Sequence, residues 1–160
     1  MLAVKIICVG KLKERFYIDA FEEYRKRLSA YCRLECAELA EQRLPEEPSP
    51  TQIRAALEKE AADILKAVPQ DAFLVALCVE GRQVPSEAMA ELIAARENSG
   101  KPKLCLVIGG SFGLSETVKN RADLRLSMSK MTFPHHLARV MLAEQIYRGF
   151  KIREGSRYHK

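Results

Sequence analysis

Runs of aliphatic residues alternate along this chain with segments in which apolar positions recur at helical spacing. Leu2–Val9, Ala72–Val79 and Lys103–Ile108 are mostly apolar runs, which is typical of strands buried on both faces of a parallel sheet. Leu34–Leu39 and Leu124–Ser127 show weaker or shorter strand patterns. The pattern therefore predicts a strand at each of these places.

Helical patterns occupy the segments between the strands. Aromatic and apolar residues recur at spacings of four and three from Tyr17 to Tyr31, as on one face of a helix. Ser49, followed by Pro50 and by Gln52, forms a capping-box start, and the apolar face that follows predicts a helix to about Val68. Further helices are predicted at three places: Ser86–Asn98, a short one from Ser115, and Pro134–Phe150.

Strands that alternate with helices indicate an α/β fold with a mostly parallel sheet flanked by helices on both faces. A chain of 160 residues fits one domain, residues 1–160. Ligands of such folds bind at the carboxyl ends of the strands. We therefore expect the site in the loops after Val79, Ile108 and Ser127, the first of which is predicted to be a turn at Glu80–Arg82.

The apolar runs are too short for a membrane helix, which needs roughly 18 residues, and the N-terminal segment lacks a signal-peptide cleavage site. We therefore expect a cytoplasmic protein with no membrane contact. Cys8, Cys78 and Cys105 lie within apolar runs and are predicted to be buried thiols. Cys32 and Cys36 have no second pair beside them, so no metal site is expected.

The charge of the chain is distributed unevenly. Residues 1–100 hold 14 Lys and Arg against 17 Asp and Glu, whereas residues 101–160 hold 12 against 4. A polyanion would dock on the C-terminal part, and nucleic acid is the usual polyanion. A merely solvated basic face is the alternative.

A glycine-rich segment, LCLVIGGSFGLSE, places Gly109, Gly110 and Gly113 between a predicted strand and a predicted helix. Glycines there allow a ligand to approach the backbone closely. The spacing is neither that of a dinucleotide-binding motif nor that of a P-loop. A tight turn with no ligand is the alternative interpretation.

The same segment also matches G-x-S-x-G, with Ser111 in the position of a hydrolase nucleophile. Asp123 follows in the expected order, and a histidine follows it: His135, His136 or His159. A serine hydrolase is therefore a competing hypothesis. Against it, three residues separate Ser111 from the next helix start at Ser115, whereas a nucleophile elbow runs directly into its helix.

The C-terminal sixty residues, with LVIGGSFGL, LSMSKMTFPHHLARVMLAEQIYRGFKI and a closing YHK, resemble the RlmH family, the ribosomal RNA large-subunit pseudouridine N3-methyltransferases. The resemblance extends over the whole chain in length and order of elements. It implies a SPOUT-type fold with a C-terminal trefoil knot, which periodicity cannot predict because knots are exceptions to the usual connection rules.

The resemblance also implies that S-adenosylmethionine (S-adenosyl-L-methionine) is bound in the knot, mostly by backbone groups, with no metal. The matching positions are Leu77, Gly109, Met128, Ser129, Lys130, Met131, Thr132 and Phe133. Taken alone, Met128 and Met131 would be core residues. Members of the family are homodimers in which the tail of one chain completes the active site of the other. A YHK tail would otherwise be expected to be disordered.

His159 is the expected acceptor for the N3 proton of pseudouridine, because the pKa of histidine lies near neutrality. Tyr158 would stack on or hydrogen-bond to the base, and Arg139, Arg148 and Lys160 would hold RNA phosphates. A small domain with no attached RNA-binding module is expected to recognise an assembled shape, and the family acts on intact ribosomes. The remaining alternatives are the serine hydrolase and a non-catalytic ribosome-binding protein.

Overall fold

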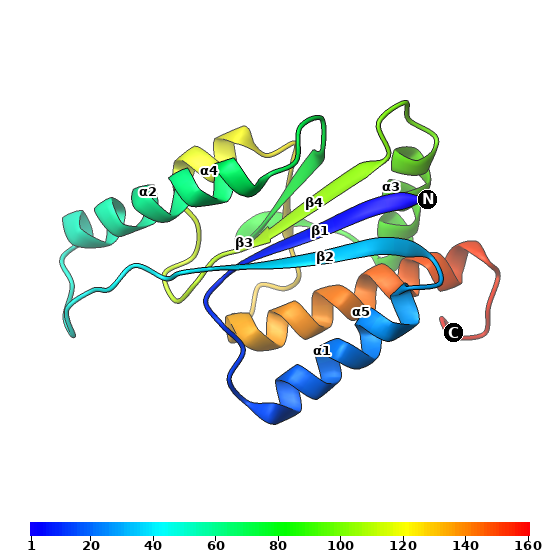
Figure 1. The fold of residues 1–160 in the computed structure, drawn as a ribbon, viewed down its shortest axis with the longest axis horizontal. Coiled ribbons are helices and arrows are strands. Elements are labelled where there is room, and N and C mark those ends of the chain that lie inside the picture. The colour runs from blue at the N-terminus through cyan, green and yellow to red at the C-terminus, as the bar shows by residue number, and fades with distance from the viewer.

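A sheet of five parallel strands in the order β2-β1-β4-β3-β5 runs through the centre of the computed structural model, which describes residues 1–160 (Figure 1). The strands are β1 (Leu2–Val9), β2 (Cys32–Leu39), β3 (Phe73–Gln83), β4 (Lys103–Ile108) and β5 (Leu124–Ser127). The helices are α1 (Arg15–Leu28), α2 (Pro50–Ala67), α3 (Ser86–Glu97), α4 (Glu116–Arg121) and α5 (His135–Arg153). The predicted α/β class with a parallel sheet is confirmed.

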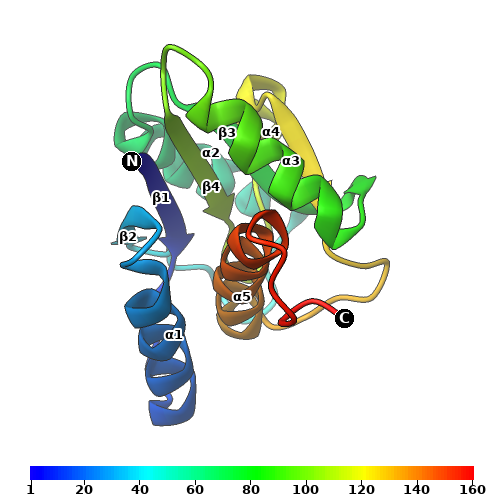
Figure 2. The same cartoon turned by 90° about the vertical axis from the view of Figure 1, so that its right-hand side faces the viewer.

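Helices cover both faces of the sheet, as predicted. α1, α3 and α5 lie on one face, with α5 in contact with both of the others, and α2 and α4 lie on the other face (Figures 1 and 2). The central strands are buried on both sides because alternate residues supply the two cores: Ile6 packs toward α1, α3 and α5, and Ile7 packs toward α2 and α4. This double burial explains the uninterrupted apolar runs.

The capping box at the start of α2 is present as predicted. Gln52 donates its N–H to the Ser49 hydroxyl over 3.1 Å, and the Gln52 side-chain oxygen accepts the Ser49 N–H over 2.8 Å. Other boundaries move by a few residues: β2 begins at Cys32 rather than Leu34, and α5 continues to Arg153. None of the helices has a segment long and apolar enough to cross a membrane.

The predicted turn at Glu80–Arg82 is wrong, because β3 continues to Gln83. Its register against β5 shifts, so that Leu77 and Arg82 both pair with Leu126 and the residues between them bulge outward. Gly81 permits this path, since a Cβ at that position would lie 2.8 Å from the Leu126 carbonyl carbon. The C-terminal trefoil knot and the single-domain organisation stay predictions.

Candidate functional site

A cavity of about 680 Å³ opens at the carboxyl ends of β3, β4 and β5. Its walls come from the bulge in β3, from the segment between β4 and α4, and from the segment between β5 and α5. These are the three strand ends at which the sequence predicts a site. The volume lies within the roughly 300–1,000 Å³ of small-molecule sites, so this edge of the sheet is the candidate site.

The segment after β4 forms a tight turn in which the backbone itself is the wall. Gly113 donates its N–H to the Gly110 carbonyl oxygen over 3.1 Å and has a φ of +81°, a conformation that favours glycine. A Cβ at Gly109 would overlap the Gly113 backbone. The turn therefore requires glycine at both positions, and it lets a ligand approach the main chain closely.

A carboxylate from a distant part of the chain holds this turn. Glu41, in the segment after β2, accepts the Ser111 N–H over 2.9 Å, although the two residues are 70 positions apart. A Cβ at Gly110 would lie only 2.6 Å from the same carboxylate oxygen. Glu41 therefore attaches the turn to the segment after β2. Sequence patterns do not reveal this role, because no local pattern relates the two segments.

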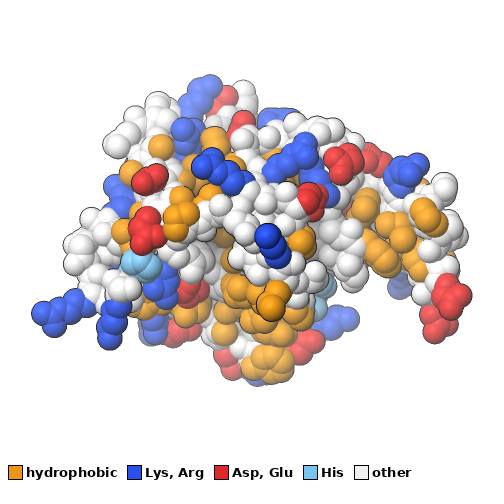
Figure 3. All heavy atoms as spheres, turned by 180° about the vertical axis from the view of Figure 1, so that it is seen from behind, with side chains coloured by type: hydrophobic (Ala, Val, Ile, Leu, Met, Phe, Trp, Pro, Cys, Tyr) orange, Lys and Arg blue, Asp and Glu red, His pale blue; other side chains and the backbone are white.

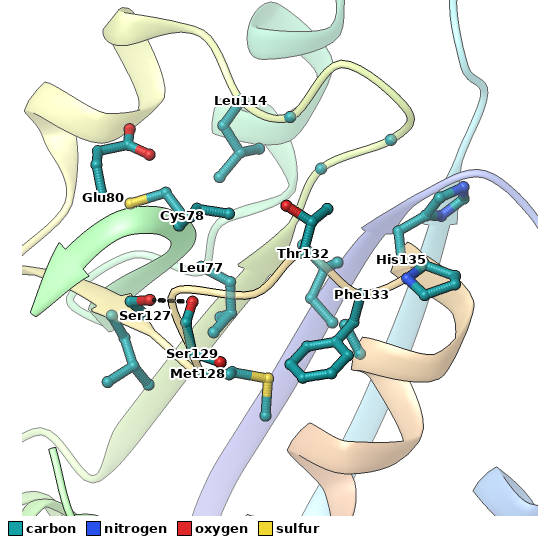
Figure 4. Close-up of a pocket in the computed structure, with 18 of the residues that line it drawn as sticks. Leu77, Cys78, Glu80, Leu114, Ser127, Met128, Ser129, Thr132, Phe133 and His135 are labelled. Carbon is teal, nitrogen blue, oxygen red and sulfur yellow. Dashed lines mark hydrogen bonds between the residues drawn. The ribbon is translucent and has the colours of Figure 1, made fainter. Parts of the chain in front are cut away.

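The segment between β5 and α5 forms the facing wall and is held by its own serines. The Ser127 hydroxyl donates to the Ser129 carbonyl oxygen over 2.9 Å, and the Met131 N–H donates to the Ser129 hydroxyl over 3.0 Å. Figure 4 shows Thr132 and Phe133 on this segment across the cavity from Leu114. The two walls are thus largely organised by hydrogen bonds within or onto the main chain.

The structure brings together nearly all the residues that the resemblance assigned to donor binding. Those that line the cavity are Leu77, Gly109, Met128, Ser129, Met131, Thr132 and Phe133. Met131 is exposed, so its interpretation as a core residue is wrong. Lys130 is exposed and does not line the cavity. That these residues hold a methyl donor stays a prediction.

Four ionisable side chains in the cavity were not among the predicted binding residues: Glu80, Lys119, His135 and the Cys78 thiol. Lys119 forms an ion pair with Glu80, and this charged hydrogen bond lowers the pKa of the carboxyl group. His135 also lines the cavity, and burial, together with the neighbouring His136, lowers its pKa. The site therefore contains an ionised carboxylate, an ammonium group and an uncharged imidazole at neutral pH.

Cys78 is not a core residue, although its apolar surroundings in the sequence predicted a buried thiol. Cys8 and Cys105 are buried, but Cys78 is only half-buried and lines the cavity at the bulge of β3. Burial and the nearby Glu80 raise the pKa of its thiol, so the thiol stays protonated at neutral pH. No three side chains of His, Cys, Asp or Glu are grouped as metal ligands, at Cys32 and Cys36 or elsewhere.

Ser111 and Asp123, the nucleophile and the acid of the hydrolase hypothesis, lie at opposite ends of the sheet, although His135 lines the same cavity as Ser111. Ser111 follows the carboxyl end of β4, whereas the Asp123 carboxylate accepts the N–H of Leu74, near the amino end of β3, over 2.7 Å. No hydrogen bond joins the Ser111 hydroxyl to a histidine; His136, for example, pairs with Glu14 at 3.6 Å. The structure therefore contradicts a Ser-His-Asp arrangement around Ser111.

The C-terminal tail lies against α5 and α3 rather than over the chain's own cavity. Tyr158 donates its hydroxyl to Glu144 over 3.1 Å, and burial and this carboxylate raise the pKa of the phenol. His159 lies 3.0 Å from a Glu87 oxygen through Nε2 and 3.2 Å from an Arg148 nitrogen through Nδ1. These contacts argue against a disordered tail, and neither Tyr158 nor His159 lines the cavity.

Two of the three predicted phosphate-binding cations are engaged within the chain. Arg139 is only 2% exposed and pairs with Glu38 at 2.6 Å, so its prediction as an RNA contact is wrong. A count of charges cannot distinguish a buried arginine from one on a basic surface. Arg148 pairs with Glu144 at 2.6 Å beneath the Tyr158 ring, whereas Lys160 is exposed and its role stays a prediction.

Comparison with known proteins adds sequence evidence to this geometry. A family model described as "Predicted SPOUT methyltransferase" matches residues 2–159. The chain is 45% identical over 159 residues to a protein of Streptococcus pyogenes serotype M5 (strain Manfredo), covering 99% of this chain and 100% of that protein. It is 48% identical over 157 residues to a protein of Clostridium novyi (strain NT), covering 98% and 99%. Both relatives are named ribosomal RNA large subunit methyltransferase H.

Solved structures agree with the fold at low sequence identity. A probable methylase family protein from Haemophilus influenzae Rd KW20 is 13% identical, with a TM-score of 0.54, and the match covers 98% of this chain and 70% of that one. A chain from a study of 2-OH methylation of C/U34 on tRNA is 18% identical, with a TM-score of 0.51, covering 94% and 92%. At these identities the likeness bears on the fold alone.

Proposed function

The chain belongs to the SPOUT methyltransferase family, and on that premise we propose that it transfers the methyl group of S-adenosylmethionine to N3 of a pseudouridine in large-subunit ribosomal RNA. One observation carries the proposal: the cavity at the strand ends is lined by seven of the eight positions that the family resemblance assigns to the donor. The names of the relatives support the RNA substrate.

The residues of the cavity fit a nucleoside donor of this kind. Leu77, Met128 and Phe133 offer apolar surface to an adenine ring, and the glycine turn offers main-chain atoms at close range. When bound, the donor supplies an electrophilic sulfonium methyl group. The protein's main task is then to align that methyl group with the acceptor nitrogen, and rigid walls held by Glu41 and Ser129 serve this alignment.

The acceptor nitrogen must lose its proton near the transition state, and we assign that proton to His159 of a second copy of the chain. The position of the tail away from its own cavity is consistent with a homodimer in which each tail enters the partner's cavity. Tyr158 would contact the base, and Lys160 would contact phosphate. Dimerisation would therefore complete the active site rather than merely stabilise it.

We propose that the substrate is ribosomal RNA within an assembled ribosome. A 160-residue chain offers little surface for reading sequence, so it recognises a folded shape in which the target base is accessible. Such a substrate also places the enzyme in the cytoplasm with the ribosomes.

Transfer of a radiolabelled methyl group from S-adenosylmethionine to ribosomes that lack the modification tests this function. We expect label in the large-subunit RNA of assembled ribosomes and none in free ribosomal RNA given in parallel. Donor binding without transfer to either substrate would contradict the RNA methyltransferase function. Equal labelling of free RNA would contradict the recognition of an assembled shape.

Ser111→Ala distinguishes the methyltransferase from the hydrolase. Because the Ser111 side chain is exposed and the hydrogen bond to Glu41 comes from the main-chain N–H, we expect this variant to retain methyl transfer within about two-fold of the unmodified chain, as for surface substitutions of less than 0.5 kcal/mol. A fluorophosphonate probe is expected to leave the unmodified chain unlabelled. Labelling that disappears in Ser111→Ala would instead support a serine hydrolase.

Glu41 is predicted to act as a positioning residue for the glycine turn. Glu41→Ala removes the carboxylate that accepts the Ser111 N–H. Because a hydrogen bond to a charged group contributes about 1.5–3 kcal/mol, we expect the affinity for S-adenosylmethionine to fall by roughly ten-fold or more. Glu41→Gln keeps an acceptor oxygen and is expected to restore most of the affinity. Calorimetric titration of the donor into both variants measures the difference, and equal affinities in the two variants would rule out this role.

A further inference from the structure

The segment from the end of β1 to the first residue of α1 carries a group of exposed cations that the charge distribution along the sequence did not reveal. Lys11, Lys13 and Arg15 lie within five positions in the otherwise acidic first hundred residues, and all three are exposed. Lys11 and Lys13 form no ion pair, and Arg15 pairs only with Asp19 on its own helix, at 3.2 Å. We call Lys11, Lys13 and Arg15 the basic loop.

An ion pair between the buried Arg139 and the more exposed Glu38 fixes the basic loop in place. Arg139 donates through Nη2 to the Gly10 carbonyl oxygen over 3.1 Å, and Glu38 accepts the Leu12 N–H over 3.0 Å. The two side chains also pair with each other at 2.6 Å. Gly10 itself has a φ of +103°, which favours glycine. The loop therefore presents its cations from a rigid base, which lowers the entropy cost of binding.

The basic loop adjoins the cavity at the same edge of the sheet. β1 pairs with β4 as far as Cys8 and Ile108, so the two strands end side by side. A Cβ at Gly10 would lie 3.3 Å from the ring of His135, which lines the cavity. Figure 1 shows the β1–α1 segment at the edge from which the β4–α4 segment also emerges.

The view from behind shows Lys and Arg side chains scattered above a hydrophobic patch at the lower centre of the molecule (Figure 3). Phe16 and Met131 are among the exposed large hydrophobic side chains, at 66% and 74%. Cations beside exposed apolar groups suit an RNA strand or a second copy of the chain. The charge favours RNA, since Lys11 and Lys13 have no ion-pair partner within the chain and the chain as a whole carries a net charge of +5.

We propose that the basic loop binds RNA phosphates beside the target nucleotide and thereby presents the target base to the cavity. The inference rests on the proposed function and adds to it the element that orients the substrate. Phosphate contacts fix the register of a nucleic acid without reading its sequence. Phosphate binding was predicted for Arg139 itself. The proposal instead assigns it to the basic loop, which Arg139 supports through Gly10.

The double variant Lys11→Ala/Lys13→Ala tests the proposal, with Lys59→Ala/Lys66→Ala on α2 as a control that removes the same charge from exposed positions on the other face of the sheet. We expect kcat/KM for ribosomes to fall about 10- to 100-fold in the first variant, while the Kd for S-adenosylmethionine stays unchanged. The slope of log affinity for ribosomes against log salt should fall by about 1.4, at roughly 0.7 for each phosphate that is no longer neutralised. The control should match the unmodified chain.

Equal ribosome affinity and salt slope in the two double variants would overturn the proposal and leave the proposed function standing. A change of oligomeric state in Lys11→Ala/Lys13→Ala, seen by sedimentation, would also overturn it, since the loop would then belong to an interface between copies. Failure of the unmodified chain to transfer methyl groups to ribosomes would instead remove the proposed function on which the inference rests. Because both lysines are exposed, the variants are expected to fold normally, which thermal unfolding checks.

Discussion

Gly109→Ala is expected to lower the affinity of the chain for S-adenosylmethionine by about 10- to 100-fold, and Gly109→Arg is expected to abolish binding. A Cβ at this position would overlap the Gly113 backbone, so the turn must open or shift. Overpacking and backbone strain of this kind cost about 1–3 kcal/mol, and each 1.4 kcal/mol corresponds to a ten-fold change in affinity. The arginine side chain would additionally occupy the cavity.

The chain offers a matched control for this prediction. A Cβ at Gly100 would meet nothing within 4 Å, so Gly100→Ala is expected to bind the donor as the unmodified chain does. Calorimetric titration of S-adenosylmethionine into the unmodified chain and the three variants measures the effect, and thermal unfolding shows whether each protein is folded. A folded Gly109→Ala variant with unchanged affinity would mean that the glycine turn does not form the donor site.

Deletion of residues 158–160 is expected to leave donor binding intact and to lower turnover by about 10²- to 10⁴-fold, the range for loss of a general base. Tyr158 and His159 contact α5 and α3 outside the cavity, so their removal does not disturb the residues that line the cavity. Single-turnover methyl transfer to ribosomes measures the loss, and calorimetry measures donor affinity. Full activity of the truncated chain would exclude the tail from catalysis.

Mixing two inactive variants distinguishes a tail that acts in the partner's cavity from one that acts in its own. Gly109→Arg retains a tail but lacks a donor site, and the truncated chain has the reverse defect. If the tail enters the partner's cavity, random mixed dimers hold one complete site each, so about a quarter of full activity should return. If the tail serves its own cavity, no mixed dimer contains a complete site and no activity returns.

Most of the fold could be predicted because each central strand is buried on both faces. That burial produces the apolar runs at Leu2–Val9 and Lys103–Ile108 that the structure confirms as β1 and β4. A turn was expected at Glu80–Arg82 because Glu, Gly and Arg in sequence are typical of a turn, but β3 continues through these residues. Pairing with Leu126 and Ser127 of β5 keeps the chain in the sheet at that point, and the local sequence does not reveal this pairing.

The position of the candidate site could be predicted for a related reason. Strand ends in a parallel sheet meet at one edge, and the glycines after Ile108 pointed to the segment that forms one wall of the cavity. Glu41 could not be predicted, because 70 residues separate it from the Ser111 N–H that it accepts. Arg139 was misassigned because an arginine in a basic helix gives no sign of its burial against Glu38.

The nature of the methylated nucleoside tests the proposed function most directly. Large-subunit RNA from ribosomes incubated with the chain and S-adenosylmethionine would be digested to nucleosides and analysed by mass spectrometry against N3-methylpseudouridine. We expect one new methylated nucleoside, pseudouridine carrying the methyl group at N3, and none with Gly109→Arg. A methyl group on a ribose hydroxyl or on another base, or no methylated nucleoside at all, would contradict the proposed function.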